Sequence, residues 1–304
     1  MKFEIILHIT TSCNYNCSYC DVIKDGKKIK SGDRDYIIDF IKKNYKNIWS
    51  FKFFWWEPLL VFENIQYIID NSQGEIDYDF FEIVTNTSLI KKLHLEYFNK
   101  NLKTLYFSVD NENIFRDDLF LNIINNYPKL ENKIYINLIV DPKKIKESKK
   151  VFDELYKLWF YGYNLLPIYF TKAWSKQELQ DLAVFIKYIL ELSVKDSKLR
   201  MYWFINGEWR ESKLSYNSLF IDTDKNIYYS DMVSTFIWNK HKDKLYVWEV
   251  DNLILANIDQ KIMESRKQVL EEVETEITNN VAWQKELQKL MDYFSKYLNY
   301  LNEK

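Results

Sequence analysis

Glycine is scarce in this chain. Only five of its 304 residues are glycine, where an average usage near 7% would give roughly 21. A fold with many turns depends on glycine for backbone conformations that other residues adopt at a cost. Ten tryptophans accompany the shortage, and most of the excess tryptophan lies in contexts where glycine is the usual residue.

Long apolar runs and excess charge are also missing. No stretch approaches the roughly 18 consecutive apolar residues of a membrane span, and residues 1–13 lack the charged, apolar and small order of a signal peptide. We therefore expect a cytoplasmic protein with no membrane partner. The net charge is −2, from 42 basic and 44 acidic residues, so nucleic acid is not an expected partner either.

Cysteine is rare and clustered. The chain has three cysteines, and all lie within eight residues, at Cys13, Cys17 and Cys20. An odd number cannot pair fully, and cytosolic thiols stay reduced. The cluster therefore favours a metal site over a disulfide framework.

The first two-thirds of the chain alternate between short apolar runs and amphipathic stretches, which is typical of βα units around a parallel sheet. The expected strands span residues 3–10, 51–56, 80–85, 103–109, 134–140 and 164–170. Apolar residues at helical spacing predict a helix over 176–194. Six such units end near residue 195 and predict an α/β fold, a partial (β/α)6 TIM-like barrel whose chemistry lies at the carboxyl ends of the strands.

The pattern changes after residue 195, so we expect two domains, a partial (β/α)6 barrel at 1–195 and a C-terminal extension at 196–304. Residues 218–231 predict a hairpin with its turn at 222–226. Residues from about 256 to the end predict long helices that complete a small α+β extension. One apolar stripe on them is expected to pack on the barrel or a second subunit: Leu287, Leu290, Met291, Phe294, Leu298 and Leu301.

The cysteines have the spacing C-x3-C-x2-C and follow directly on the first expected strand. Three thiolates on one loop can hold three irons of a [4Fe–4S] cluster, which leaves the fourth iron open for chemistry. One alternative is zinc, with His8 as the nearest histidine to complete a three-cysteine set. A purely structural cluster is the other alternative.

This motif, with an aromatic residue before its last cysteine and a strand before its first, resembles the radical S-adenosylmethionine (SAM) superfamily. The resemblance continues through residue 170. It implies that SAM binds the open iron of a [4Fe–4S] cluster and is cleaved by one electron to a 5′-deoxyadenosyl radical that abstracts hydrogen from a substrate. It also implies an electron donor such as flavodoxin or ferredoxin.

The resemblance implies two groups of SAM contacts near the start of the chain. Tyr19 matches the aromatic residue that lies near the adenine. Glu57 and Pro58 match the end of a Gly-Gly-Glu-Pro segment whose exposed edge and carboxylate receive the methionyl ammonium. Trp55 and Trp56 replace the two glycines, and an indole cannot reproduce a glycine where backbone must approach a ligand.

Several other tryptophans also occupy glycine-like contexts, at Trp159, Trp174, Trp238 and Trp248. We hypothesise that the gene comes from a bacterium that decodes UGA as glycine, and that the printed sequence reads those codons as tryptophan. The alternative is a true Trp-Trp pair that reshapes the site. The residue at position 56, tryptophan or glycine, is therefore placed among the cofactor-binding positions.

Further cofactor contacts follow from the resemblance at the ends of later strands: Asn86, Ser108, Asp110, Arg116, Val140 and Leu166. Asn86 lies in a Thr-Asn-Thr segment similar to the family's Thr-Asn-Gly, near the methionyl group. Ser108 and Asp110 resemble the family's Ser-Leu-Asp, and Arg116 is the candidate partner of the SAM carboxylate. Val140 and Leu166 are expected to pack near adenine.

The hairpin at 218–231 resembles SPASM or twitch extensions, in which a cysteine near Ser230 would bind an auxiliary cluster. No cysteine exists outside the first motif, so the sequence excludes an auxiliary cluster held by cysteines. The resemblance implies a place close to the peptide-modifying branch, with a peptide or protein substrate. Modification of a nucleotide, RNA or small metabolite, and a non-catalytic iron–sulfur or zinc scaffold, remain as alternatives, and no catalytic residue beyond the cofactor set is identified.

Overall fold

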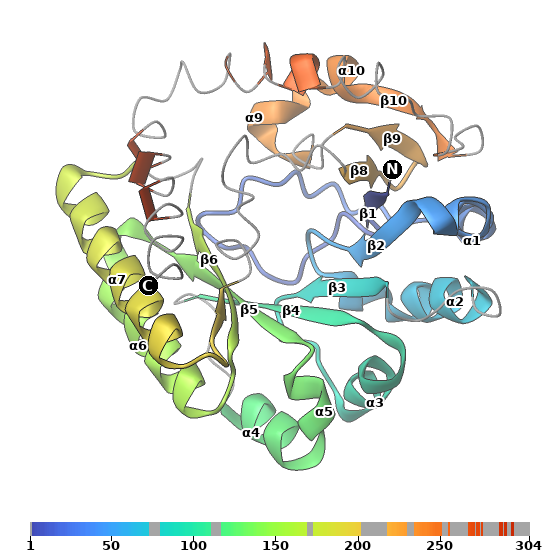
Figure 1. The fold of residues 1–304 in the computed structure, drawn as a ribbon. Coiled ribbons are helices and arrows are strands. Elements are labelled where there is room, and N and C mark those ends of the chain that lie inside the picture. Colours follow the sequence, from blue (N-terminus) through green and yellow to red (C-terminus); the bar gives the residue numbers. More distant parts are fainter. Residues whose placement is uncertain are drawn as a thin grey trace. The chain divides into compact units, whose positions relative to one another are not determined.

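A computed structural model describes residues 2–72, 80–110, 117–168, 173–201, 218–229 and 234–250, with isolated stretches between 255 and 294. Its contacts divide the chain into two compact units. Unit 1 comprises residues 1–16, 21–105 and 214–277, and unit 2 comprises residues 17–20, 106–213 and 278–304. Both units consist of strands with helices along them (Figure 1).

Among its described residues, unit 1 contains six strands in the order β10-β9-β8-β1-β2-β3. Its strands are β1 (Phe3–Leu7), β2 (Ile48–Phe53), β3 (Phe81–Thr85), β8 (Ser218–Ile221), β9 (Asn226–Tyr228) and β10 (Tyr246–Glu249). β1 pairs in parallel with both β2 and β8, whereas β9 is antiparallel to β8 and to β10. The C-terminal hairpin therefore extends the sheet of the first βα units.

The helices of unit 1 are α1 (Asp33–Asn44), α2 (Phe62–Ser72), α3 (Lys92–Asn101), α9 (Phe236–Asn239) and α10 (Lys242–Leu245), with short 3-10 turns η1 (Tyr45–Asn47) and η2 (Pro58–Val61). Every residue of β1 and of β3 is buried. Burial on both faces is typical of parallel strands covered by helices, and α1 and α2 pack against each other beside them (Figure 1).

Unit 2 contains the sheet β4-β5-β6-β7. Its strands are β4 (Thr104–Val109), which begins at the end of unit 1, β5 (Ile134–Val140), β6 (Gly162–Pro167) and β7 (Arg200–Met201). Its helices are α4 (Asp117–Asn126), α5 (Pro128–Glu131), α6 (Ile145–Lys157) and α7 (Lys176–Lys195), with the 3-10 turn η3 (Pro142–Lys144). β5 pairs in parallel with β6, and β6 with β7.

Helices α6 and α7 run side by side (Figure 1). Phe152 and Phe185 meet edge to face with ring centroids 6.1 Å apart, and Tyr188 donates a hydrogen bond of 2.9 Å to Asp153. α7 begins at a capping box, because the Ser175 side chain accepts from the Glu178 amide and the Glu178 carboxylate accepts from the Ser175 amide. The helix expected over 176–194 is thus confirmed as 176–195.

The expected α/β fold is confirmed, because strands alternate with helices along the described chain and each unit contains parallel strand pairs. The predicted hairpin is confirmed as β8 and β9, although the parallel pairing of β8 with β1 was not predicted. The domain division at residue 195 stays a prediction. Most of the helical region expected after 256 lies outside the described residues, while Leu287 and Phe294 of its stripe are buried.

Within the described ranges, no helix is both long enough and apolar enough to cross a membrane.

Candidate functional site

The cysteine loop begins shortly after β1. Cys13, Cys17 and Cys20 are not in disulfide bonds, and all three are partly exposed. The Cys13 sulfur accepts hydrogen bonds from the Tyr15 amide at 3.4 Å and from the Asn86 side-chain amide at 3.8 Å. N–H donors stabilise a thiolate and tune the potential of a cluster bound to it, so the surroundings of Cys13 fit an iron ligand.

The zinc alternative depends on His8. Its Nδ1 lies 3.1 Å from the Ser234 hydroxyl, and its ring centroid lies 3.7 Å from that of Phe220. In the described part of the chain, no three His, Cys, Asp or Glu side chains are already gathered around one point at metal-binding distance. The ring of His8 thus contacts Phe220 of β8 and Ser234, which follows the hairpin.

Glu57 lies in the turn after β2 and is fully buried. Its carboxylate accepts hydrogen bonds from the Leu59 amide at 3.0 Å, the Asn86 amide at 2.8 Å and the Thr85 hydroxyl at 2.9 Å. Burial raises the pKa of this carboxyl to about 7, while these three donors lower it. Glu57 thus joins the end of β2 to the end of β3, and Pro58 is buried beside it at the start of η2.

The strand expected over 51–56 ends at Phe53, which corrects the predicted boundary by three residues. The reason is the backbone of Trp55 and Trp56, whose φ angles are +67° and +49°. These left-handed angles break an extended strand and favour glycine. The two indoles lie against His8, with ring centroids 6.4 Å and 4.5 Å from the imidazole.

Trp159 shows the same backbone feature at the end of α6, with φ +71°. Its amide donates to the carbonyl of Tyr156 at 3.0 Å, and the Phe160 amide donates to the carbonyl of Leu155 at 3.2 Å. These bonds form a Schellman motif, whose left-handed residue is usually glycine. The Trp159 side chain is 57% exposed, so core packing does not account for a large residue here.

The other glycine-like contexts differ. Trp174 is buried and donates from its indole to the carbonyl of Ile168 at 2.7 Å. Trp238 lies within α9 and Trp248 within β10. None of these three has a positive φ, so among the described tryptophans the backbone favours glycine only at positions 55, 56 and 159.

Two cofactor candidates of unit 2 meet directly. The Tyr19 hydroxyl donates a hydrogen bond to the Asp110 carboxylate, which is buried. Burial and the neighbouring Asp110 raise the pKa of Tyr19 above its usual range, so the phenol keeps its proton. This bond ties the end of the cysteine motif to the end of β4.

Three of the remaining candidates lie near the carboxyl ends of strands, as predicted. Ser108 is the next-to-last residue of β4, Val140 is the last residue of β5, and Leu166 is the next-to-last residue of β6. Arg116 lies outside the described residues, as do Ser230 and Asp231.

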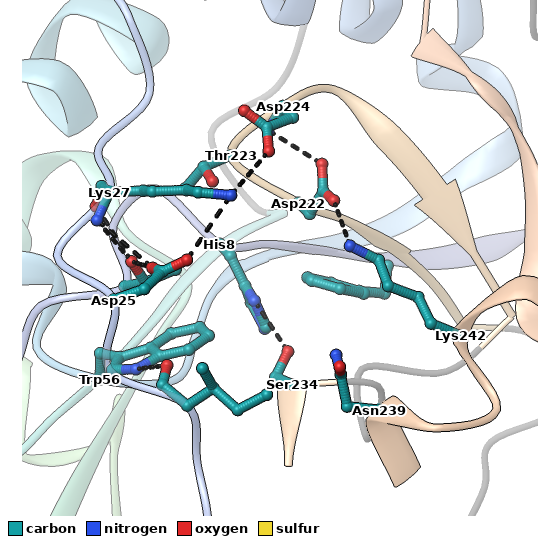
Figure 2. A pocket seen from close by; sticks show the side chains of 13 residues that line it. His8, Asp25, Lys27, Trp56, Asp222, Thr223, Asp224, Ser234, Asn239 and Lys242 are labelled. Carbon is teal, nitrogen blue, oxygen red and sulfur yellow. Dashed lines mark hydrogen bonds and ion pairs between the residues drawn. The ribbon is translucent and has the colours of Figure 1, made fainter. Parts of the chain in front are cut away.

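Sequence reasoning missed a pocket in unit 1 (Figure 2). It has a volume of about 80 Å³ and lies between the end of β1, the β8–β9 hairpin and α9–α10. The residues that line it include His8, Lys27, Trp56, Phe220, Ser234 and Lys242. Two acidic residues of the hairpin turn, Asp222 and Asp224, also line the pocket, and they are the sequence feature that could have indicated it.

No protein-family model matches the sequence, and no curated protein matches it either. Solved structures do match. A structure of anSMEcpe with bound AdoMet and Cp18Cys peptide is 13% identical, with a TM-score of 0.66, over 88% of this chain and 83% of that chain. Streptococcus suis SuiB bound to S-adenosylmethionine is 16% identical, with a TM-score of 0.62, over 88% and 68%.

A third match is BtrN in complex with AdoMet and 2-DOIA, which is 13% identical with a TM-score of 0.51 over 88% of this chain and 87% of that chain. At these identities the likeness concerns the fold. The chain shares the fold of these AdoMet-bound proteins, in agreement with the α/β fold expected from the sequence.

Proposed function

We propose that this chain is a radical SAM enzyme with one [4Fe–4S] cluster, bound by Cys13, Cys17 and Cys20, and that it abstracts hydrogen from a peptide or protein. The observation that carries the proposal is the C-x3-C-x2-C motif in the loop that follows β1, in a chain with this fold. The two N–H donors on the Cys13 sulfur support the same assignment.

When bound, the cluster and SAM supply one-electron cleavage of the sulfonium to methionine and a 5′-deoxyadenosyl radical, which takes a hydrogen atom from the substrate. The protein positions the groups. Glu57 fixes the turn that follows β2 through its bonds to Thr85 and Asn86, and Asn86 in turn contacts Cys13. A cysteine ligand and the expected methionyl contacts are thereby linked within unit 1.

We further propose that positions 55 and 56 are glycine in the active protein. With tryptophan, two indoles stand at the edge where the methionyl ammonium is expected. With glycine, the left-handed backbone carries no strain and the edge is open to a ligand. The three left-handed tryptophans support this reading, and UGG codons at 55 and 56 would overturn it.

A peptide substrate is supported by the anSMEcpe structure, which holds a peptide together with AdoMet. The structure of BtrN with 2-DOIA favours the second candidate, a small metabolite. Capture of labelled peptide against labelled RNA by the reconstituted protein would separate a peptide from a nucleic acid substrate. An electron donor such as flavodoxin or ferredoxin is part of the proposal.

The test is anaerobic. Protein with glycine at 55 and 56 is reconstituted with iron and sulfide, mixed with SAM and dithionite, and analysed for 5′-deoxyadenosine beside the protein as printed. Alanine at both positions is the matched control, because it removes the indoles but keeps a Cβ on left-handed backbone. We expect product from the glycine form, less from the alanine form and little from the printed form.

Iron bound by all three forms with product from none would contradict the proposed reaction and favour the scaffold alternative. Loss of iron on changing any one of the three cysteines to alanine is expected in every form.

A further inference from the structure

The pocket of unit 1 borders the proposed cofactor edge. One of its walls is the indole of Trp56, whose Nε1 donates to the carbonyl of Ile23 at 2.9 Å. The same indole lies edge to face on His8, as Figure 2 shows. A group bound in this pocket would therefore lie beside the residue whose backbone is expected to approach SAM.

His8 is the pocket's buried polar group. It is 1% exposed, its Nδ1 is bonded to Ser234, and Phe220 packs on its ring. Its Nε2 has no hydrogen-bond partner among the described residues. Because an unpaired buried nitrogen destabilises the fold, such an atom in the wall of a pocket indicates a ligand.

The charged groups of the pocket already have partners. Lys27 lies between Asp25 and Asp224, at 3.5 Å and 3.2 Å from their carboxylates. Lys242 lies 3.4 Å from Asp222. A charged ligand would have to displace one of these partners, whereas a neutral polar ligand would not.

Burial, with a smaller contribution from Lys242, lowers the pKa of His8 well below its usual value. The imidazole is therefore neutral at pH 7, with one nitrogen that donates and one that accepts. The Ser234 hydroxyl can take either role toward Nδ1, which leaves Nε2 free to adapt to a ligand that donates or accepts.

We propose that the pocket around His8 binds the substrate of the proposed reaction through a neutral group that both donates and accepts hydrogen bonds, as the carboxamide of Asn or Gln does. This inference rests on the proposed function for its place in the reaction. The site consists of the Nε2 of His8, the ring of Phe220 and a rim of paired charges. The Trp56 indole is a further wall in the printed sequence, and glycine at position 56 would remove that wall without changing the other groups.

The test uses the reconstituted full-length protein with glycine at 55 and 56, labelled with 15N-histidine. The chain has three histidines, so the spectrum contains three imidazoles, and replacing His8 with Phe assigns its signals. Acetamide, acetate and methylammonium are titrated separately as probes. We expect a saturable shift of the His8 signals with acetamide at millimolar concentration, and no saturable shift at His94 or His241.

Ser234→Ala removes the partner of Nδ1 and is expected to weaken acetamide binding about fivefold, which corresponds to one ordinary hydrogen bond. Ser193→Ala is the matched control, because that hydroxyl donates within α7 in unit 2, and it should leave the affinity unchanged.

Tighter binding of acetate or methylammonium than of acetamide would overturn the ligand class, and no saturable shift at His8 with any probe would overturn the site. Failure of this site and failure of the proposed function are distinguishable. Acetamide binding without SAM cleavage would support the proposed binding site and contradict the proposed reaction. SAM cleavage without acetamide binding would contradict the binding site alone.

Discussion

The exposed end of α6 gives the sharpest test of whether the tryptophans stand at glycine positions. Trp159 has φ +71° and closes a Schellman motif. We compare Trp159→Gly with Trp159→Ala, because both variants remove the indole and differ only by the Cβ. Both variants lose the contacts of the indole with Tyr161 and with Lys198, whose ammonium lies 5.5 Å from the ring centroid. These contacts therefore do not contribute to the difference in stability between the two variants.

The magnitude follows from two opposing effects. A Cβ on left-handed backbone costs roughly 1–2 kcal/mol. Glycine loses more conformational freedom on folding, which costs about 0.5–1 kcal/mol relative to alanine. The glycine variant should therefore be more stable than the alanine variant by about 0.5–1 kcal/mol, measured as the free energy of unfolding from urea titrations at equal m-values.

Lys150 provides the matched control because it lies in the interior of the same helix, with a side chain that is 78% exposed. There the order should reverse, with Lys150→Gly less stable than Lys150→Ala by about 1 kcal/mol. If Trp159→Gly were no more stable than Trp159→Ala while the Lys150 pair behaved as expected, the glycine assignment at 159 would be refuted. Peptide mass spectrometry of the protein from its native host would then be expected to show tryptophan.

Three further predictions concern buried charges and the cluster. The pKa of Glu57 is raised to about 7, so the protonated carboxyl, which stabilises the fold, is lost as pH rises from about 4.5 to 7. The free energy of unfolding, measured by urea titration at several pH values, should therefore fall by about 3 kcal/mol over this range. Glu57→Gln should remove this pH dependence. The Lys52 ammonium lies 2.5 Å from the Glu4 carboxylate and 3.5 Å from that of Glu82, and all three side chains are nearly buried. Lys52→Met should therefore lower the free energy of unfolding by about 3–5 kcal/mol at pH 7 in the same assay. A loss below 1 kcal/mol would show that the two carboxylates are not stabilised by this ammonium. Asn86→Ala removes an N–H donor from the sulfur of the first cysteine and should lower the cluster's reduction potential without loss of iron. The potential is measured by redox titration followed by electron paramagnetic resonance, and an unchanged potential would argue against that hydrogen bond.

The βα alternation was predictable because its signal is local. Burial on both faces gives parallel strands such as β5 their continuous apolar sequence, and the expected 134–140 is the observed range. The capping box at Ser175 likewise lies within one short stretch of sequence. The parallel pairing of β8 with β1 was not predictable in this way, because it joins segments about 215 residues apart and leaves no local pattern.

Site residues show the same division. The cysteine motif is contiguous, so its chemistry could be read directly from the sequence. The bond between Tyr19 and Asp110 and the network around Glu57 depend on which strand ends become neighbours. His8 was considered as a zinc ligand or as a residue that lines the barrel, since its unpaired Nε2 and its place in the wall of a pocket have no sequence signal.

Two other residues limit what left-handed backbone alone can prove. Thr87 and Lys225 have φ +66° and +68°, and no misread UGA codon can account for a threonine or a lysine. Lys225 lies in the hairpin turn, and its ammonium, 3.4 Å from Asp33 and 3.9 Å from the ring of Tyr36, gives it contacts that offset the strain. Trp159 has weaker compensation, since its side chain is mostly exposed. The assignment of glycine therefore depends on strain without adequate compensation, which is why position 159 decides it better than positions 55 and 56, where the indoles also pack on His8.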